Sequence, residues 1–195
     1  MPKVKLPSGV DLYYESHGQG EPLILVPSTA YSGEVWKPSQ IPLANSLNLI
    51  FFDPRGCGRS IPMQEVYTIE QMAVDIVALM DHLEIPSAHL LGHSMGGRIA
   101  LSMTQNFPGR VKSLIMAASG SGPAARLGTD CIPGLPHRLV LEMVELGFQK
   151  FIYNEICESD TFFTDDYRSQ HRDKVEEFYR LAWATHAKLP EFIHL

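Results

Sequence analysis

The sequence predicts an α/β fold: a doubly wound, mostly parallel sheet that is followed by a helical cap. Two observations lead to this prediction. Over about the first 118 residues, continuous apolar runs alternate with segments of helical periodicity, and such runs are typical of strands buried on both faces of a parallel sheet. A stretch rich in glycine and proline then begins at Ser119, and only helical patterns follow it. Strands that alternate with helices imply right-handed crossovers and a doubly wound sheet.

The chain begins with segments that predict a hairpin and two buried strands. Residues 3–6 and 11–15 flank the turn cluster Pro7-Ser8-Gly9, so they predict a pair of antiparallel strands. Two apolar runs without alternation follow, at 22–26 and 47–52. We expect both runs to be strands inside the parallel sheet.

The clearest predicted helix begins at Thr68. The segment Thr68-Ile69-Glu70-Gln71 matches a capping box, and apolar residues recur at helical spacing after it until the chain reaches Pro86. A short strand at 87–91, a helix at 98–107 and a strand at 111–118 complete the predicted core.

The change in composition after the last predicted strand divides the chain. We expect an α/β core at 1–119 and a helical cap at 120–195. Within the cap, apolar residues keep helical spacing over 139–152, and a second helix is predicted from about Asp165 to Ala187.

Composition excludes several classes of protein. The chain of 195 residues has a formal net charge of −6, and it shows no basic stripe of the kind that binds nucleic acid. No apolar run approaches the roughly eighteen residues of a membrane span, and no apolar leader follows Met1, so we expect a cytoplasmic protein without a membrane partner. The three cysteines have no metal-ligand spacing. We expect no metal site and no cofactor.

The pentapeptide Gly92-His93-Ser94-Met95-Gly96 carries the strongest chemical signal in the sequence. It stands between the apolar run His89-Leu90-Leu91 and a helix-like segment that starts at Gly97. This is the G-x-S-x-G nucleophile elbow in its strand–turn–helix context, where the turn is so tight that the residues two before and two after the serine must lack a Cβ. Ser94 is therefore the candidate nucleophile. The alternative is an ordinary serine at a turn that requires glycines.

A second motif, in addition to the elbow, indicates a family. The loop Asp53-Pro54-Arg55-Gly56-Cys57-Gly58-Arg59-Ser60 resembles the D-x-R-G-x-G-x-S loop of α/β-hydrolases. Together the two motifs make the chain resemble a carboxylesterase-like α/β-hydrolase with a helical cap, over about residues 10–120. The same loop is also similar to proline iminopeptidases, but those usually carry tryptophan where this chain has Met95.

The resemblance implies a serine hydrolase that acts on a carboxylic ester or a related acyl compound. Ser94 would be the nucleophile, and the backbone N–H groups of Met95 and Thr29 would form the oxyanion hole. The family generally has His-Gly in the loop that carries the second donor, whereas this chain has Pro27-Ser28-Thr29. We expect His93 to be a packing or hydrogen-bonding residue and not the base, because strand alternation turns it from the face of the nucleophile. The residues expected to line the substrate pocket are Ser28, His93, Phe148 and Phe151.

The triad acid and histidine of such enzymes follow the serine on loops after later strands. No further strand is predicted after residue 118, and none of the eight histidines falls in such a place. We therefore expect a C-terminally incomplete fold, with the acid and the histidine outside this chain. The exposed edge of the strand at 111–118 would then take a complementing C-terminal chain or a second copy.

Two readings of function stay open at this point. A serine nucleophile argues against dehalogenases, which use aspartate there, but it is shared by esterases, C–C bond hydrolases and perhydrolases. The alternative from another class is a catalytically silent relative that binds a small molecule or a protein partner.

Overall fold

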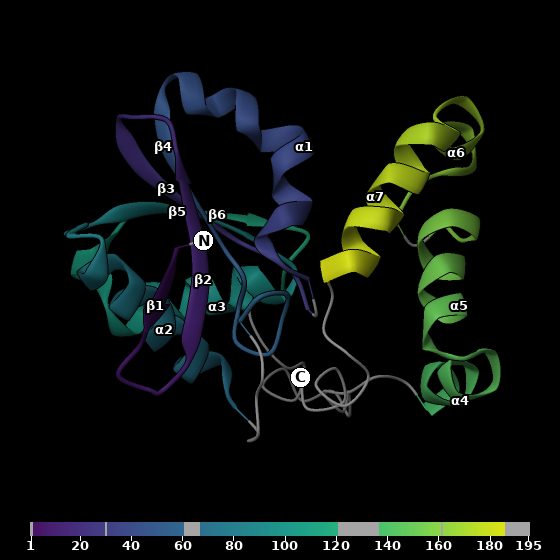
Figure 1. Cartoon of the computed structure of the whole chain (residues 1–195), viewed down its shortest axis with the longest axis horizontal. Helices are drawn as coiled ribbons and strands as arrows, with labels where there is room; N and C mark the ends of the chain where they lie inside the picture. Colours follow the sequence, from purple (N-terminus) through teal and green to yellow (C-terminus); the bar gives the residue numbers. More distant parts are fainter. Residues whose placement is uncertain (1, 30, 61–66, 121–136, 161, 186–195) are drawn as a thin grey trace. The chain divides into compact units, whose positions relative to one another are not determined.

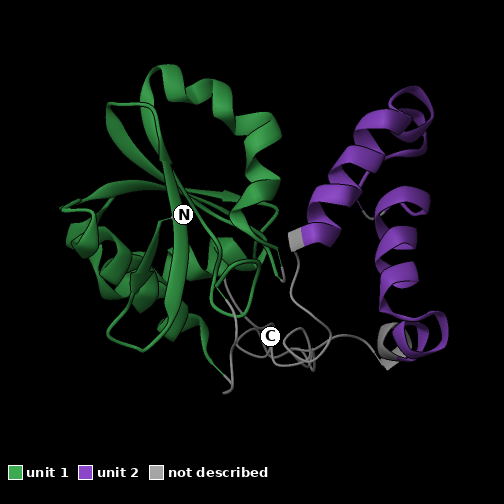
Figure 2. Cartoon of the chain, in the orientation of Figure 1, with its two compact units in different colours: residues 1–121, 185–195 green, residues 122–184 purple. Residues whose placement is uncertain are grey.

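The computed structural model of the chain describes residues 2–29, 31–60, 67–120, 137–160 and 162–185 (Figure 1). It divides into two compact units, which are coloured separately in Figure 2: Met1–Ser121 with Thr185–Leu195, and Gly122–Ala184. The sequence placed the boundary between residues 119 and 120. That division stays a prediction, because most of the segment joining the two units lies outside the described residues.

The described part of the first unit is built on a mixed six-stranded sheet with the strand order β1-β2-β4-β3-β5-β6. Strand β2 pairs antiparallel with β1 and with β4, while the pairs β3–β4, β3–β5 and β5–β6 are parallel. The strands are β1 (Lys3–Lys5), β2 (Asp11–His17), β3 (Glu21–Val26), β4 (Leu47–Phe52), β5 (Ala88–His93) and β6 (Val111–Ala117). The predicted mostly parallel sheet and the opening hairpin are confirmed.

Residues of β3 and β4 alternate between two apolar clusters. Ile24 and Val26 belong to the larger cluster, which includes residues of α2 (Ile69–His82) and α3 (Met95–Asn106), whereas Leu23 and Leu25 belong to a smaller one that packs against Trp36. Figure 1 shows α2 and α3 on one side of the sheet and α1 (Lys37–Gln40) on the other. Both faces of the central strands are therefore covered, which is why their sequences are uninterrupted apolar runs.

Helix α2 begins at a side-chain cap, whereas α3 begins after Ser94, whose side chain forms no cap hydrogen bond. At α2, Thr68 Oγ1 accepts a hydrogen bond from the Gln71 N–H at 3.2 Å, and Gln71 Oε1 accepts one from the Thr68 N–H at 2.8 Å, so the predicted capping box is present. Helix α3 begins at Met95, three residues before the predicted start. Gly96 and Gly97 lie in the first turn of this helix, where Gly96 contacts the end of β3. Short 3₁₀ turns lie at Gly33–Trp36 (η1), Ile41–Asn45 (η2) and Pro108–Arg110 (η3).

The second unit is helical in its described part. It contains α4 (His137–Leu146), α5 (Phe148–Tyr153), the π-helical turn η5 (Asn154–Glu158), α6 (Asp165–Gln170) and α7 (Arg172–Thr185). The prediction of a single helix from about Asp165 to Ala187 is wrong, because the structure has two helices, α6 and α7, over this range. The backbone leaves the helical region at His171 (φ −135°, ψ 41°), and the buried Arg168 binds the carbonyl oxygens of Ser159 and Phe163, which ties α6 to the loop before it.

No helix in the described ranges is both long enough and apolar enough to cross a membrane.

Candidate active site

Ser94 connects β5 to α3 and has a backbone conformation that non-glycine residues rarely adopt. Its φ is 53° and its ψ is −117°, and it is the N-cap of α3. Hydrogen bonds hold this conformation on both sides of the residue. The Ser94 N–H donates to the carbonyl of Ala117 at 3.0 Å, and the Ser94 carbonyl accepts from the Gly97 N–H at 3.0 Å and from Ser119 Oγ at 2.6 Å.

The glycines around Ser94 are required by close contacts. A Cβ at Gly92 would lie 2.4 Å from the carbonyl oxygen of Gly96, and a Cβ at Gly96 would lie 2.2 Å from that of Val26. A Cβ at Gly97 would lie 2.3 Å from Ser119 Oγ. The turn therefore has the steric requirement expected of a nucleophile elbow at Gly92 and Gly96, and the third glycine makes room for the Ser119 side chain.

The residues on either side of Ser94 have different environments. Met95 is the first residue of α3, where a backbone N–H has no acceptor within the helix and the helix dipole favours negative charge. His93, the last residue of β5, is half-buried, and its ring lies edge-on to that of Trp36 with centroids 6.4 Å apart. Burial lowers the pKa of His93. The ring thus contacts Trp36, and the prediction that His93 is not the base stays a prediction.

The loop after β3, described at residues 27–29 and 31–32, starts beside the elbow. Val26 is in register with Gly92 on the neighbouring strand, and the carbonyl oxygens of Val26 and Pro27 close the space above Gly96. Ser28 and Thr29 are half-buried, and the Ser28 carbonyl accepts a hydrogen bond from the Tyr31 N–H at 3.2 Å. The loop is thus in the right region for an oxyanion donor, and the role of Thr29 stays a prediction.

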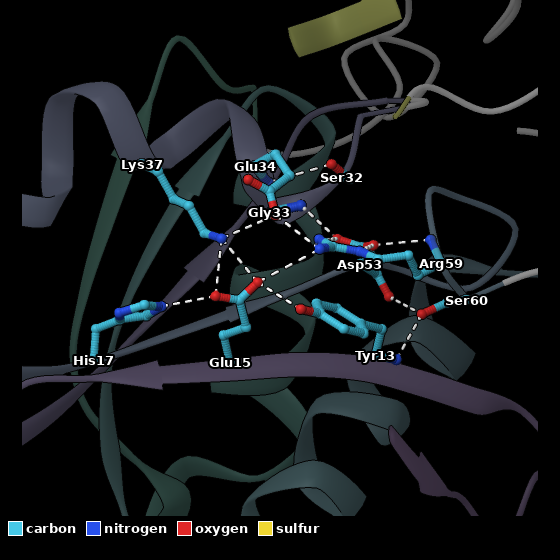
Figure 3. Close-up of polar contacts among 10 residues, drawn as sticks. All are labelled: Tyr13, Glu15, His17, Ser32, Gly33, Glu34, Lys37, Asp53, Arg59 and Ser60. Carbon is cyan, nitrogen blue, oxygen red and sulfur yellow. Dashed lines mark hydrogen bonds and ion pairs between the residues drawn. The ribbon is translucent and has the colours of Figure 1, made fainter. Parts of the chain in front are cut away.

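A buried carboxylate holds the far end of this loop (Figure 3). Asp53, which follows β4, has no exposed surface and accepts hydrogen bonds from the Gly33 N–H at 3.0 Å, from the Arg59 N–H at 2.9 Å and from Arg59 Nε and Nη2 at 2.7 and 3.0 Å. The Arg59 guanidinium also stacks over the ring of Tyr13 at 3.5 Å. These contacts give Asp53 a structural role at the start of the loop 53–60.

A second carboxylate, Glu15 on β2, extends the network (Figure 3). It accepts hydrogen bonds from Lys37 Nζ at 2.8 and 2.9 Å and from Tyr13 Oη at 2.6 Å, and it lies 2.8 Å from His17 Nε2. Burial alone would raise the pKa of Glu15, but its hydrogen bonds to Lys37, Tyr13 and His17 outweigh this and lower the pKa to about 2. Burial and the bond to Glu15 raise the pKa of Tyr13 to about 12. Sequence reasoning missed the cluster of Glu15, Lys37, Tyr13 and His17, because none of these residues lies in a recognised motif.

Two of the residues predicted to line the pocket belong to the second unit. Phe151 is buried there, and Phe148 is half-buried with its ring centroid 6.3 Å from that of Trp183. Phe148 also borders an open groove of about 570 Å³, together with Tyr153 and Tyr179. Their assignment to the substrate pocket stays a prediction, as does that of Ser28 and His93. Within the described residues, no group of three or more potential ligands could hold a metal ion.

This fold and elbow agree with the comparison to known families. Residues 21–192 match the family with the α/β hydrolase fold, and the chain belongs to that family. The RutD protein of Caulobacter sp. (strain K31), provisionally named a carbamate hydrolase, is 34% identical over 117 residues, which are 57% of this chain and 44% of RutD. The BpoC protein of Mycobacterium tuberculosis, provisionally named a non-heme bromoperoxidase, is 33% identical over 112 residues, 56% of this chain and 42% of that protein. The matched segment thus spans less than half of these relatives.

Solved structures give the same fold. A thermophilic esterase from Thermogutta terrifontis superposes with a TM-score of 0.77 at 23% identity, over 100% of this chain and 70% of that one. An enol-lactonase from Burkholderia xenovorans LB400 gives a TM-score of 0.75 at 21% identity, over 99% of this chain and 71% of that one. The predicted membership of the α/β-hydrolases is confirmed.

Proposed function

We propose that Ser94 is the nucleophile of a serine hydrolase that cleaves a carboxylic ester or a related acyl compound such as a carbamate. The observation that carries the proposal is the backbone of Ser94. It is held at φ 53° between two glycines that have no space for a Cβ, and it directly precedes the first N–H of α3. A strained conformation of this kind persists where the surrounding structure enforces it, and such sites cluster at functional residues.

The proposed chemistry has two steps. Ser94 Oγ attacks the carbonyl carbon of the substrate, its proton passes to a base, and the carbonyl oxygen becomes an oxyanion that the Met95 and Thr29 N–H groups stabilise. When the oxyanion collapses, the base returns the proton to the leaving group, and water then hydrolyses the acyl-enzyme. A segment outside this chain, either a C-terminal continuation or a complementing chain, would supply the base and the acid that orients it.

The experiment is active-site labelling with a fluorophosphonate. The full-length product of the reading frame and the 195-residue chain are each treated with the probe, and the labelled peptide is identified by mass spectrometry. We expect labelling at Ser94 in the full-length product and weak labelling in the shorter chain, because a serine without its base remains a neutral alcohol. Ser94→Ala is expected to abolish labelling and to lower the hydrolysis of short p-nitrophenyl esters by on the order of 10⁴-fold or more.

A matched control is Ser39→Ala, which removes an exposed hydroxyl on α1 and should leave both readouts unchanged. Full activity in the Ser94→Ala variant would exclude the serine mechanism. A full-length wild type that folds but neither reacts with the probe nor hydrolyses esters, carbamates or C–C substrates would favour the second candidate, a catalytically silent binding protein. The unburied strand β6 favours that candidate, because it offers a surface for a partner chain.

A further inference from the structure

We propose that Asp53 and Arg59 are positioning residues that fix the oxyanion loop, residues 27–29 and 31–32, which carries the Thr29 N–H. This inference rests on the proposed function, because it assigns these two residues to the geometry of the same site. It concerns how the loop is held in place, and neither residue is expected to contact the substrate.

The oxyanion loop is fixed at both of its ends. At its start, the carbonyl oxygens of Val26 and Pro27 lie at 2.2 and 2.5 Å from the position that a Cβ of Gly96 would occupy. At its end, the Gly33 N–H donates to Asp53 Oδ1 at 3.0 Å, and a Cβ at Gly33 would lie 2.7 Å from the Phe52 carbonyl oxygen. The first end is placed by the pairing of β3 with β5, in which Val26 is in register with Gly92, so the second end depends on Asp53.

Asp53 can hold Gly33 only while its charge is compensated. The carboxylate is fully buried, and a buried charge without partners is costly. Arg59 supplies three of the four donors to it, one from the backbone and two from the guanidinium. Burial by itself would lower the pKa of the Arg59 guanidinium, but hydrogen bonding to Asp53 raises it, so the group stays charged. A Cβ at Gly58, where φ is +50°, would lie 2.4 Å from Asp53 Oδ2, so this glycine permits the turn that brings Arg59 to the carboxylate.

Arg59 also reaches beyond Asp53 to the segment that follows the loop. Its Nη1 atom lies 2.8 Å from Glu34 Oε1 in η1, and Lys37 Nζ joins Glu34 to Glu15 on β2. A planar guanidinium can bind two carboxylates in this way at once, whereas the single ammonium of a lysine cannot reproduce both contacts. The fork of Arg59 therefore joins Asp53, which binds the Gly33 N–H, to Glu34, the next residue of η1 (Figure 3).

The catalytic consequence follows from the sensitivity of an oxyanion hole to donor position. A shift of about 1 Å in a catalytic group can cost on the order of a hundredfold in rate. We therefore expect Arg59→Lys and Asp53→Asn to lower kcat by on the order of tenfold to a hundredfold while KM changes little, because the donor acts on the transition state. The affinity for a trifluoromethyl ketone, whose adduct places an oxyanion in the same hole, should fall by a similar factor.

The control is Arg55→Lys. Arg55 forms a buried pair with Asp75 on α2, through two hydrogen bonds of 2.6 Å, and it also contacts Tyr67. Both partners lie outside the oxyanion loop. This variant removes the same kind of guanidinium fork from a buried carboxylate. We expect it to lower the unfolding midpoint and to leave kcat and ketone affinity within about twofold of wild type.

The test uses the full-length protein and measures kcat, KM, ketone affinity and the unfolding midpoint, with hydrogen exchange of the loop amides as a readout that needs no turnover. Faster exchange at the loop with a selective loss of kcat in Arg59→Lys would support the proposal. The proposal would be overturned if Arg59→Lys had a normal kcat and lost only stability, as is expected for Arg55→Lys. If Arg59→Lys does not fold, Asp53→Asn is judged by the same criteria. Failure of the proposed function would be recognised separately, because the wild type itself would not react at Ser94.

Discussion

The backbone of Ser94 has a strained conformation that contacts with neighbouring residues stabilise. A non-glycine residue at positive φ costs on the order of 1–3 kcal/mol. The cost is offset by hydrogen bonds to Ser94 from both directions: its N–H reaches the end of β6 at Ala117, and its carbonyl receives the hydroxyl of Ser119. The strand after the elbow in sequence thus stabilises the conformation of the elbow, although the two segments are 25 residues apart.

At the same scale, the elbow glycines should be intolerant of any side chain. In Gly92→Ala the new Cβ would lie 2.4 Å from the backbone oxygen of Gly96, which cannot move aside as a side chain could. We expect a loss of stability of roughly 1–3 kcal/mol or more, measured by urea unfolding. The control is Gly109→Ala, because a Cβ at Gly109 would have no atom within 4 Å. Equal stabilities of the two variants would show that the elbow is less tightly packed than the structure indicates.

At the scale of elements, the features that could be predicted were those encoded by neighbours in the sequence. The uninterrupted apolar run of β3, the capping box at Thr68 and the glycines of the elbow each depend on residues within one segment. The parts that were missed depend on contacts between distant segments. For example, the contacts of Glu15 with Lys37 and Arg59 form only because β2, α1 and the loop after β4 fold together. No spacing of residues in the sequence predicts these contacts.

The break between α6 and α7 has the same explanation. The local sequence continues a helical pattern through His171, but the buried Arg168 is bound to carbonyl groups of the preceding loop, and the chain turns there. Tertiary contacts of this kind override helix propensity, which is a weak preference. Tertiary contacts also explain why α3 starts earlier than predicted. Glycine has a low helix propensity, but Gly96 lies against the end of β3 and Gly97 against Ser119, where a side chain would have no space.

The loop after β3 gives a prediction at this scale. If Thr29 acts only through its backbone N–H, Thr29→Ala should leave kcat nearly unchanged, because the side chain takes no part. Thr29→Pro removes the N–H and should lower kcat by on the order of a hundredfold or more. Steady-state kinetics compares the two variants, and circular dichroism checks that each is folded. Normal turnover in a folded Thr29→Pro variant would place the second oxyanion donor elsewhere.

At the scale of the whole molecule, the six strands differ in how well they are covered. In β3 four of six residues are buried, and β5 alternates buried and half-buried positions. Strand β6 ends the sheet, pairs only with β5 among the described strands, and has no buried residue, although its sequence Val111–Ala117 is largely apolar. Ile115 on this strand is 53% exposed. An apolar strand at an open edge is a template for pairing with another chain.

We therefore propose that β6 is covered in the active protein by a complementing C-terminal segment or by a second copy. Intact-mass spectrometry with light scattering should show the 195-residue chain either bound to such a segment or associated with itself, since β6 pairs with only one of the described strands and its apolar residue Ile115 is exposed. Ile115→Lys should reduce self-association, because a charge on an edge strand opposes pairing.

Val74→Lys is the matched control for that variant, because Val74 is exposed to a similar extent, 48%, but lies on α2 away from the sheet edge. If exposed apolar surface in general drives association, both lysines should reduce it equally, and the edge of β6 would have no special role. If edge pairing drives it, only Ile115→Lys should do so. A wild-type species of 21.8 kDa that is monodisperse, monomeric and resistant to protease would contradict the proposal, because such a species would need no second chain to protect β6.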